Sequence, residues 1–109
     1  MKTLKAEKQA RHGDLLLTKI EELPQNSPHV ANTKMILAQG TATGHAHVMS
    51  GKDCKFYKNE KDGTIYVKID KTAKLTHEEH ATIEFGKGIW KVQHQVEYGP
   101  DETARQVAD

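Results

Sequence analysis

The chain has 109 residues, which suffices for one domain of ordinary size but not for two independent hydrophobic cores. Sixteen Lys and Arg residues against fifteen Asp and Glu residues give a formal net charge of +1, without the basic excess of a dedicated DNA-binding or membrane-surface protein. A nucleic-acid partner would need a local basic patch, and the charge balance does not indicate one.

Cysteine usage and the N-terminus bear on the cellular compartment. Cys54 is the only cysteine, so the chain can form neither an internal disulfide nor a cysteine-rich zinc site. Residues 1–8 are charged and lack the apolar stretch of a signal peptide, and no later run approaches the roughly 20 apolar residues of a membrane span. We expect a cytoplasmic protein with no membrane partner.

The first third of the chain predicts a lead-in, a strand and a loop. Residues 1–11 are polar and rich in Lys, and we expect a flexible N-terminal lead-in to a single β-rich domain over residues 12–109. Residues 15–20 are apolar and lie between Gly13 and Pro24, which predicts a partly buried strand, and residues 24–32 have the composition of a loop.

Short strands continue through the middle of the chain. Residues 35–38 and 45–49 predict two of them, separated by Gly40 and Gly44. Residues 54–69 predict a hairpin, because alternate residues of its second strand are apolar and an Asp-Gly pair supplies the turn. Cys54, on an alternating apolar strand, is expected to be a buried structural thiol rather than a nucleophile.

The last third predicts strands at 73–76, 82–85 and 89–98, with residues 86–88 as a tight connection. In the final strand one face carries the apolar set that we expect in the core: Trp90, Val92, His94, Val96 and Tyr98. Residues 100–108 begin with Pro and two acids, which predicts a short C-terminal helix. The fold class is therefore mainly β, either a small barrel or a two-layer sandwich.

Two tight histidine pairs are the strongest chemical signal. His45 and His47 are two residues apart, so on a strand they point to the same face. His77 and His80 are three apart and can converge on one side of a turn. Imidazole nitrogen is a good ligand for divalent metals, so we predict one metal site formed by these four residues, with zinc as the expected ion.

Glu78 and Glu79, between the second pair, are candidate catalytic bases toward a metal-bound water. The sequence H-E-E-H is not the metalloprotease helix motif H-E-x-x-H, and paired glutamates on a turn are often only solvated. His94 is expected to be a core histidine, and His12 and His29 surface residues. Thr43 and Thr76, directly before the two motifs, suggest local hydrogen bonding.

The chain resembles a family of small bacterial and phage proteins. The resemblance covers residues 12–109 and rests on four segments: Gly13–Leu17, Ala42–His47 with its G-H-x-H motif, Leu75–His80 with its T-H-E-E-H motif, and Val92–Tyr98. It implies that the histidines are a family signature, without an activity. The H-x-H strand is also similar to the first metal motif of cupins, but residues 48–52 lack the expected acid.

Three functions remain open on this sequence. The first is a metal-dependent hydrolase of a small molecule or phosphoester, with three histidine ligands and an open coordination position. The second is metal-independent cleavage of RNA or cyclic nucleotide phosphodiesters, in which one histidine acts as base and another as acid. The third is a non-enzymatic binding or accessory module. The sequence does not determine the oligomeric state.

Overall fold

The computed structural model describes residues 3–39, 45–94, 96–98 and 104–106. These residues are mainly β and contain no helix. The strands are β1 (Leu4–Ala6), β2 (Gln9–His12), β3 (Leu15–Ile20), β4 (His29–Gln39), β5 (Ala46–Lys58), β6 (Ile65–Thr76), β7 (Ile83–His94), β8 (Val96–Tyr98) and β9 (Ala104–Gln106). Within this part of the chain, no helix could cross a membrane.

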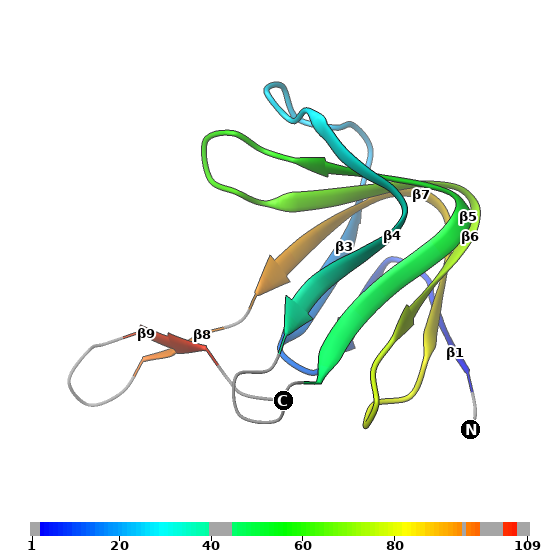
Figure 1. The fold of residues 1–109 in the computed structure, drawn as a ribbon, viewed down its shortest axis with the longest axis vertical. Coiled ribbons are helices and arrows are strands. Elements are labelled where there is room, and N and C mark those ends of the chain that lie inside the picture. Colours follow the sequence, from blue (N-terminus) through cyan, green and yellow to red (C-terminus); the bar gives the residue numbers. More distant parts are fainter. Residues whose placement is uncertain (1–2, 40–44, 95, 99–103, 107–109) are drawn as a thin grey trace.

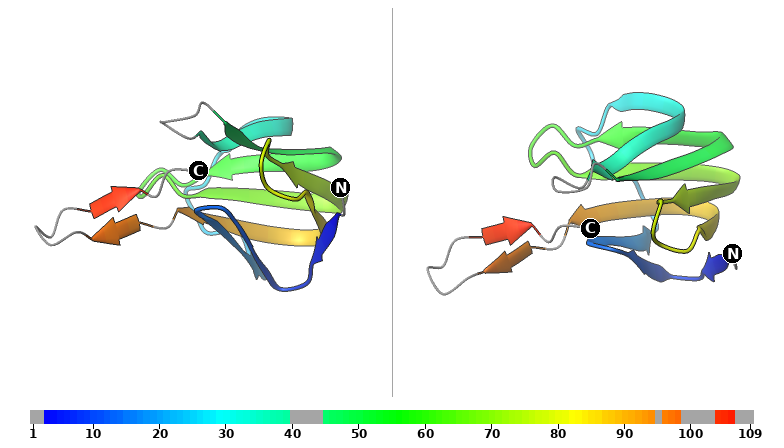
Figure 2. Two further views of the ribbon diagram at one scale, coloured as in Figure 1. Left: turned by 90° about the horizontal axis from the view of Figure 1, so that it is seen from below. Right: turned by 60° about the horizontal axis from the view of Figure 1, so that its bottom comes forward.

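Seven strands form one sheet (Figure 1). Six of them lie in the order β2-β3-β7-β6-β5-β4, and the seventh, β1, pairs with β7 outside this order. Neighbours along this order are antiparallel, and β1 adds a parallel pairing to the first residues of β7. Strands β8 and β9 form a separate two-stranded ribbon beside the main sheet (Figure 2). The main sheet is not closed, because β2 and β4 are its edges and do not pair with each other. The barrel alternative is therefore wrong, whereas the mainly β class is confirmed.

The three long strands β5, β6 and β7 bend near their middles (Figure 1). The pairing register shifts between Ser50 and Cys54 and again between Ile69 and Thr72, and such bulges bend strands locally. Gly51 lies in this bend, where an added Cβ would approach the carbonyl oxygen of Thr72 to 2.7 Å. A glycine there lets β5 and β6 stay in close contact through the bend.

Alternate apolar residues of β3, β5, β6 and β7 pack into one core, because successive side chains of a strand point to opposite faces. Its largest fully buried side chains are Trp90, Phe56 and Phe85. Trp90 and Val92 are buried as predicted, while Gln93 is exposed and Lys91 partly so. The predicted hairpin at 54–69 is confirmed by the pairing of Cys54 with Ile69 and of Lys58 with Ile65. Cys54 is buried, also as predicted.

Two expectations for β7 are wrong. Residues 86–88 are not a connection between strands, because β7 runs unbroken from Ile83 to His94 and Gly88 takes up the bend with a positive φ of 147°. His94 is exposed rather than buried, since it is the last residue of β7 and lies beyond the core cluster. The side chains of Val96 and Tyr98 lie outside the described residues.

The two ends of the chain also differ from expectation. The predicted C-terminal helix is not observed: Ala104–Gln106 pairs with β8 as strand β9, and the rest of that segment lies outside the described residues. The segment expected to be a flexible lead-in contains β1 and β2. Strand β2 forms a tight hairpin with β3, and Gly13 provides the positive φ of 63° that the turn needs. This hairpin brings residues near position 12 close to the predicted site.

Candidate metal centre

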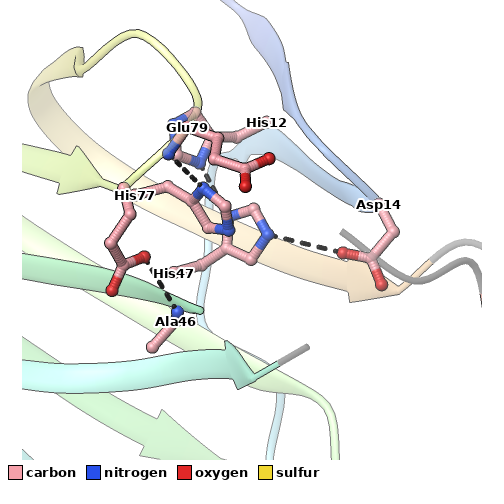
Figure 3. A network of polar contacts seen from close by, with 7 residues as sticks. His12, Asp14, Ala46, His47, His77 and Glu79 are labelled. Carbon is pink, nitrogen blue, oxygen red and sulfur yellow. Dashed lines mark hydrogen bonds and ion pairs between the residues drawn. The ribbon is translucent and has the colours of Figure 1, made fainter. Parts of the chain in front are cut away.

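Three separate segments meet at one end of the sheet. They are the turn between β2 and β3, the start of β5, and the loop between β6 and β7. Figure 3 shows side chains from all three segments pointing toward one another. The antiparallel pairing of β5 with β6 explains part of this arrangement, because Val48 lies opposite Thr76 and the histidines follow directly on each side.

The four histidines predicted from the sequence lie together. The ring centroids of His47 and His77 are 4.4 Å apart, those of His77 and His80 are 4.5 Å apart, and those of His45 and His77 are 5.5 Å apart. His47 is almost fully buried because it points inward from β5, whereas His45, just before that strand, is partly exposed. The Nε2 atoms of His77 and His80 are buried although the residues are partly exposed.

Two overlapping groups have the composition of metal ligands. His47, His77 and His80 each offer one ligand atom, and these atoms all lie within 4.8 Å of one another. His45, His77 and Glu78 form a second group by the same measure. Nitrogens bound tetrahedrally to one zinc ion lie about 3.4 Å apart, given bonds of about 2.1 Å. The ligand atoms of either group would have to approach one another by up to about 1.4 Å to surround one zinc ion tetrahedrally.

His12 was expected at the surface and is instead part of the cluster. It is 2% exposed, and its Nδ1 lies 2.8 Å from Nδ1 of His47 while its Nε2 lies 2.9 Å from the carbonyl oxygen of Ala81. Burial lowers the pKa of His12 to about 4, against the opposing effect of the Ala81 carbonyl and with further lowering by the neighbouring histidines. The only local signal was its position directly before a Gly-Asp turn and an apolar strand.

Asp14 is a second residue that the sequence did not single out. It lies in the turn after His12, is 6% exposed, and places Oδ1 3.6 Å from Nε2 of His47 (Figure 3). Buried carboxylates are rare unless they are paired or bind a metal. The side chain of His47 thus lies between His12 at one ring nitrogen and Asp14 at the other.

The two glutamates have different surroundings. Glu78 accepts a hydrogen bond from the backbone N–H of Ala46, at 3.2 Å, and its pKa is lowered mainly by its own backbone N–H and also by that of Ala46. Glu79 is 59% exposed and places Oε1 3.2 Å from Nδ1 of His45, while its backbone N–H donates to Nδ1 of His77 at 3.0 Å. Both glutamates therefore hold the loop against the histidines.

One shallow depression opens beside this cluster. It is lined by Ala46, Val48, Thr76, His77 and Glu78. Thr76 donates across the sheet to the backbone carbonyl of Val48, which is not the local hydrogen bond expected for it, and Thr43 lies outside the described residues. The depression therefore lies on the side of the second ligand group, which contains His77 and Glu78. His29, the first residue of β4, is exposed as expected and forms a hydrogen bond with Asn32.

The fold and site define a small domain with one bent, mainly antiparallel sheet and a histidine cluster at one end of it. Comparison with protein families gives one result: the chain belongs to the family described as domain of unknown function (DUF8820), whose model matches residues 11–95. That range includes every residue of the cluster, from His12 to His80. Neither the curated proteins nor the solved structures include a match to this chain.

Proposed function

We propose that this protein binds a divalent metal ion through His47, His77 and His80, with zinc as the first candidate. The observation that carries the proposal is the placement of three imidazole ligand atoms within 4.8 Å of one another, two of the residues coming from a loop and one from a buried strand. Zinc accepts imidazole nitrogen readily, and three protein ligands are the usual number in sites that keep a position for water.

A purely structural role explains this cluster less well. A neutral histidine has one N–H donor and one acceptor nitrogen, and a protonated ring repels its neighbours. The rings of His12, His47, His77 and His80 all have centroids within 6.0 Å of one another, and the three neighbouring rings contribute to the lowering of the pKa of His12. A bound cation would use several of these nitrogen lone pairs as ligands, and at neutral His77 it would have to displace the N–H of Glu79 from Nδ1.

The proposal extends to chemistry at the depression beside His77. An ion held by three histidines keeps a position for water, which it can activate to hydrolyse a small molecule or a phosphoester. Of the two candidate bases, Glu78 has a lowered pKa and a backbone partner, which suit a ligand or an anchor of the loop. Glu79 is exposed beside His45, and this position suits a base toward water.

A metal-independent reaction is supported by one feature, the pair of His45 and His77. Their ring centroids are 5.5 Å apart, and His77 lines the depression, so one ring could act as base and the other as acid on a phosphodiester. His12 and His47 are too deeply buried for this role. Activity that persists in a chelator would favour this reaction over the metal-dependent one.

The first test is metal analysis of protein purified without a histidine tag. We expect about one zinc ion per chain by mass spectrometry of the metal, and micromolar or tighter binding by titration calorimetry. His47→Ala should lose the ion, whereas His29→Ala, at an exposed histidine far from the cluster, should keep it. Absence of any bound divalent metal in the wild-type protein would refute the proposal.

The second test separates hydrolysis from binding alone. The zinc-loaded protein is assayed with bis(4-nitrophenyl) phosphate and with a short RNA, each with and without EDTA. Hydrolysis that EDTA removes and zinc restores supports the metal-dependent reaction. A loaded protein that is inert toward both probes would instead favour the binding-module function, in which the ion fixes the loop for a partner.

A further inference from the structure

We propose that His12 is a positioning residue that fixes Nε2 of His47 as the metal-binding atom, and that Asp14 is an additional ligand on that side of the ion. This inference rests on the proposed metal binding and adds two residues from the β2–β3 turn to it. Three histidines and Asp14 together fill the four positions of a tetrahedral zinc ion, so ligation by Asp14 and hydrolysis by a bound water exclude each other and are tested separately. Its basis is a chain of four polar groups: the carbonyl of Ala81, the ring of His12, the ring of His47 and the carboxylate of Asp14.

The direction of each hydrogen bond follows from the Ala81 end. A carbonyl oxygen only accepts, so Nε2 of His12, at 2.9 Å from it, must carry a proton. In neutral His12 the other nitrogen, Nδ1, then has a lone pair. Nδ1 of His47 lies 2.8 Å away and must donate its N–H to that lone pair. The proton of neutral His47 is therefore on Nδ1, and the lone pair is on Nε2.

This arrangement is the one that metal-binding histidines use. A ligating histidine is neutral and almost always donates its other ring N–H to a fixed acceptor, which sets the tautomer and the ring orientation. Here the acceptor is a second imidazole, and the Ala81 carbonyl fixes that imidazole in turn. His12 has no geometric route to a more direct role, since both of its nitrogens have these partners.

The carboxylate of Asp14 then faces a lone pair rather than an N–H. A carboxylate oxygen and an imidazole nitrogen 3.6 Å apart in a buried site can both bind one cation that lies between them. Zinc bonds of about 2.1 Å to nitrogen and to oxygen, at a tetrahedral angle, separate the two donor atoms by about 3.4 Å. The spacing of Oδ1 and Nε2 is within a few tenths of an ångström of that value, which favours a shared ion.

The tautomer of His47 is tested by NMR on protein with ¹⁵N-labelled histidine. Long-range ¹H–¹⁵N spectra of the chelator-treated and zinc-loaded protein should show a proton on Nδ1 of His47 and on Nε2 of His12. A proton on Nε2 of His47 in both states would overturn the role of His12. The chelator-treated sample decides this point even for a protein that binds no metal, so failure of the proposed function remains distinguishable.

Substitutions test the two residues separately. His12→Leu removes the acceptor for His47 and should weaken zinc binding about 10- to 100-fold, the usual cost of losing such a partner. His12→Asn keeps an acceptor near the position of Nδ1 and should restore most of the affinity. His12→Leu and His12→Asn variants of equal zinc affinity would overturn the positioning role, whatever their thermal stability.

Asp14→Asn keeps the size of the side chain and removes its charge. We expect at least a tenfold loss of zinc affinity and a changed visible absorption spectrum of the Co²⁺-loaded protein, because the set of ligand atoms changes. His29→Asn is the control and should leave both unchanged. Wild-type affinity and an unchanged Co²⁺ spectrum in Asp14→Asn would exclude Asp14 as a ligand while leaving the three-histidine site intact.

Discussion

A buried polar side chain lies near each end of the β5–β6 pair, Asn59 at one end and His47 at the other. The two side chains have different kinds of partner. At the hairpin end, Asn59 is buried and its amide donates to Gln25 and Ser27, while its carbonyl oxygen accepts from the N–H groups of Lys61 and Asp62. At the other end, the neighbours of a buried histidine are largely other histidines.

The difference is that Asn59 is fully paired within its turn, whereas the histidines form groups that could hold a metal ion. Asn59 uses both of its donors and both acceptor positions on the loops around it, so nothing remains to bind a ligand. The histidine cluster instead brings the same chemical group together several times from three distant segments. The first arrangement stabilises a turn, and the second could hold a cation.

The largest expected effect comes from a substitution in the hydrophobic core, which both ends of the β5–β6 pair pack against. Val92 is buried on β7 between Leu17 and Ile65, and Val92→Asp would place an unpaired charge in the core. We expect a loss of at least about 4 kcal/mol and an unfolded chain by circular dichroism. Gln93→Asp, one residue away on the exposed face, should cost less than about 0.5 kcal/mol. Equal losses would show that the assigned faces of β7 are wrong.

The sequence predicts the alternation of buried and exposed residues along the strands well, but it predicts the candidate site only in part. The hairpin at 54–69 and the burial of Trp90 follow from local pattern, and the closeness of His45 and His47 to His77 agrees with the predicted grouping of the two histidine pairs. His12 and Asp14 could not be found this way, because their place depends on the pairing of β3 with β7, which spans most of the chain. The bend at Gly86 and Gly88 reads locally as a turn, since only the neighbouring strands show that β7 continues through it.

The next expected effect is a loss of folding stability at low pH, and it arises at the histidine end alone. Burial holds the pKa of His12 at about 4 in the folded protein, below its ordinary value of 6.5, so the unfolded chain binds more protons between these pH values. The stability of the metal-free protein should therefore fall as the pH drops from about 6.5 to about 4, by up to about 3 kcal/mol from this group.

Urea unfolding in EDTA across that pH range measures the loss. His12→Gln cannot titrate, so its stability should fall less steeply than that of the wild type, whereas His29→Gln, at an exposed position, should follow the wild-type curve. Parallel curves for all three proteins would mean that His12 is not held neutral by burial.

A smaller loss is expected at the hairpin end. Asn59→Ala leaves the N–H groups of Lys61 and Asp62 and the carbonyl of Gln25 without this partner, for a cost of about 2 kcal/mol. Asn59→Asp keeps the two accepted bonds and should lose less. Because the two ends are distant, zinc should raise the melting temperature of Asn59→Ala as much as that of the wild type. Loss of zinc binding in this variant would show that the ends are coupled.

The smallest expected effect on zinc binding is at Glu79, and it is compared with the effect at the neighbouring Glu78. Its carboxylate is 59% exposed and faces His45 rather than the buried group, and exposed ion pairs contribute at most about 1 kcal/mol. Glu79→Gln should therefore change zinc affinity by no more than about threefold and leave the melting temperature unchanged. Glu78→Gln, in a group with His45 and His77, should weaken zinc binding more. A general base is needed for turnover and not for binding, so at saturating zinc the hydrolysis of the phosphodiester probe should fall to background in Glu79→Gln and persist in Glu78→Gln. A tenfold loss of zinc in Glu79→Gln would make Glu79 a ligand, and unchanged hydrolysis would remove it as the base.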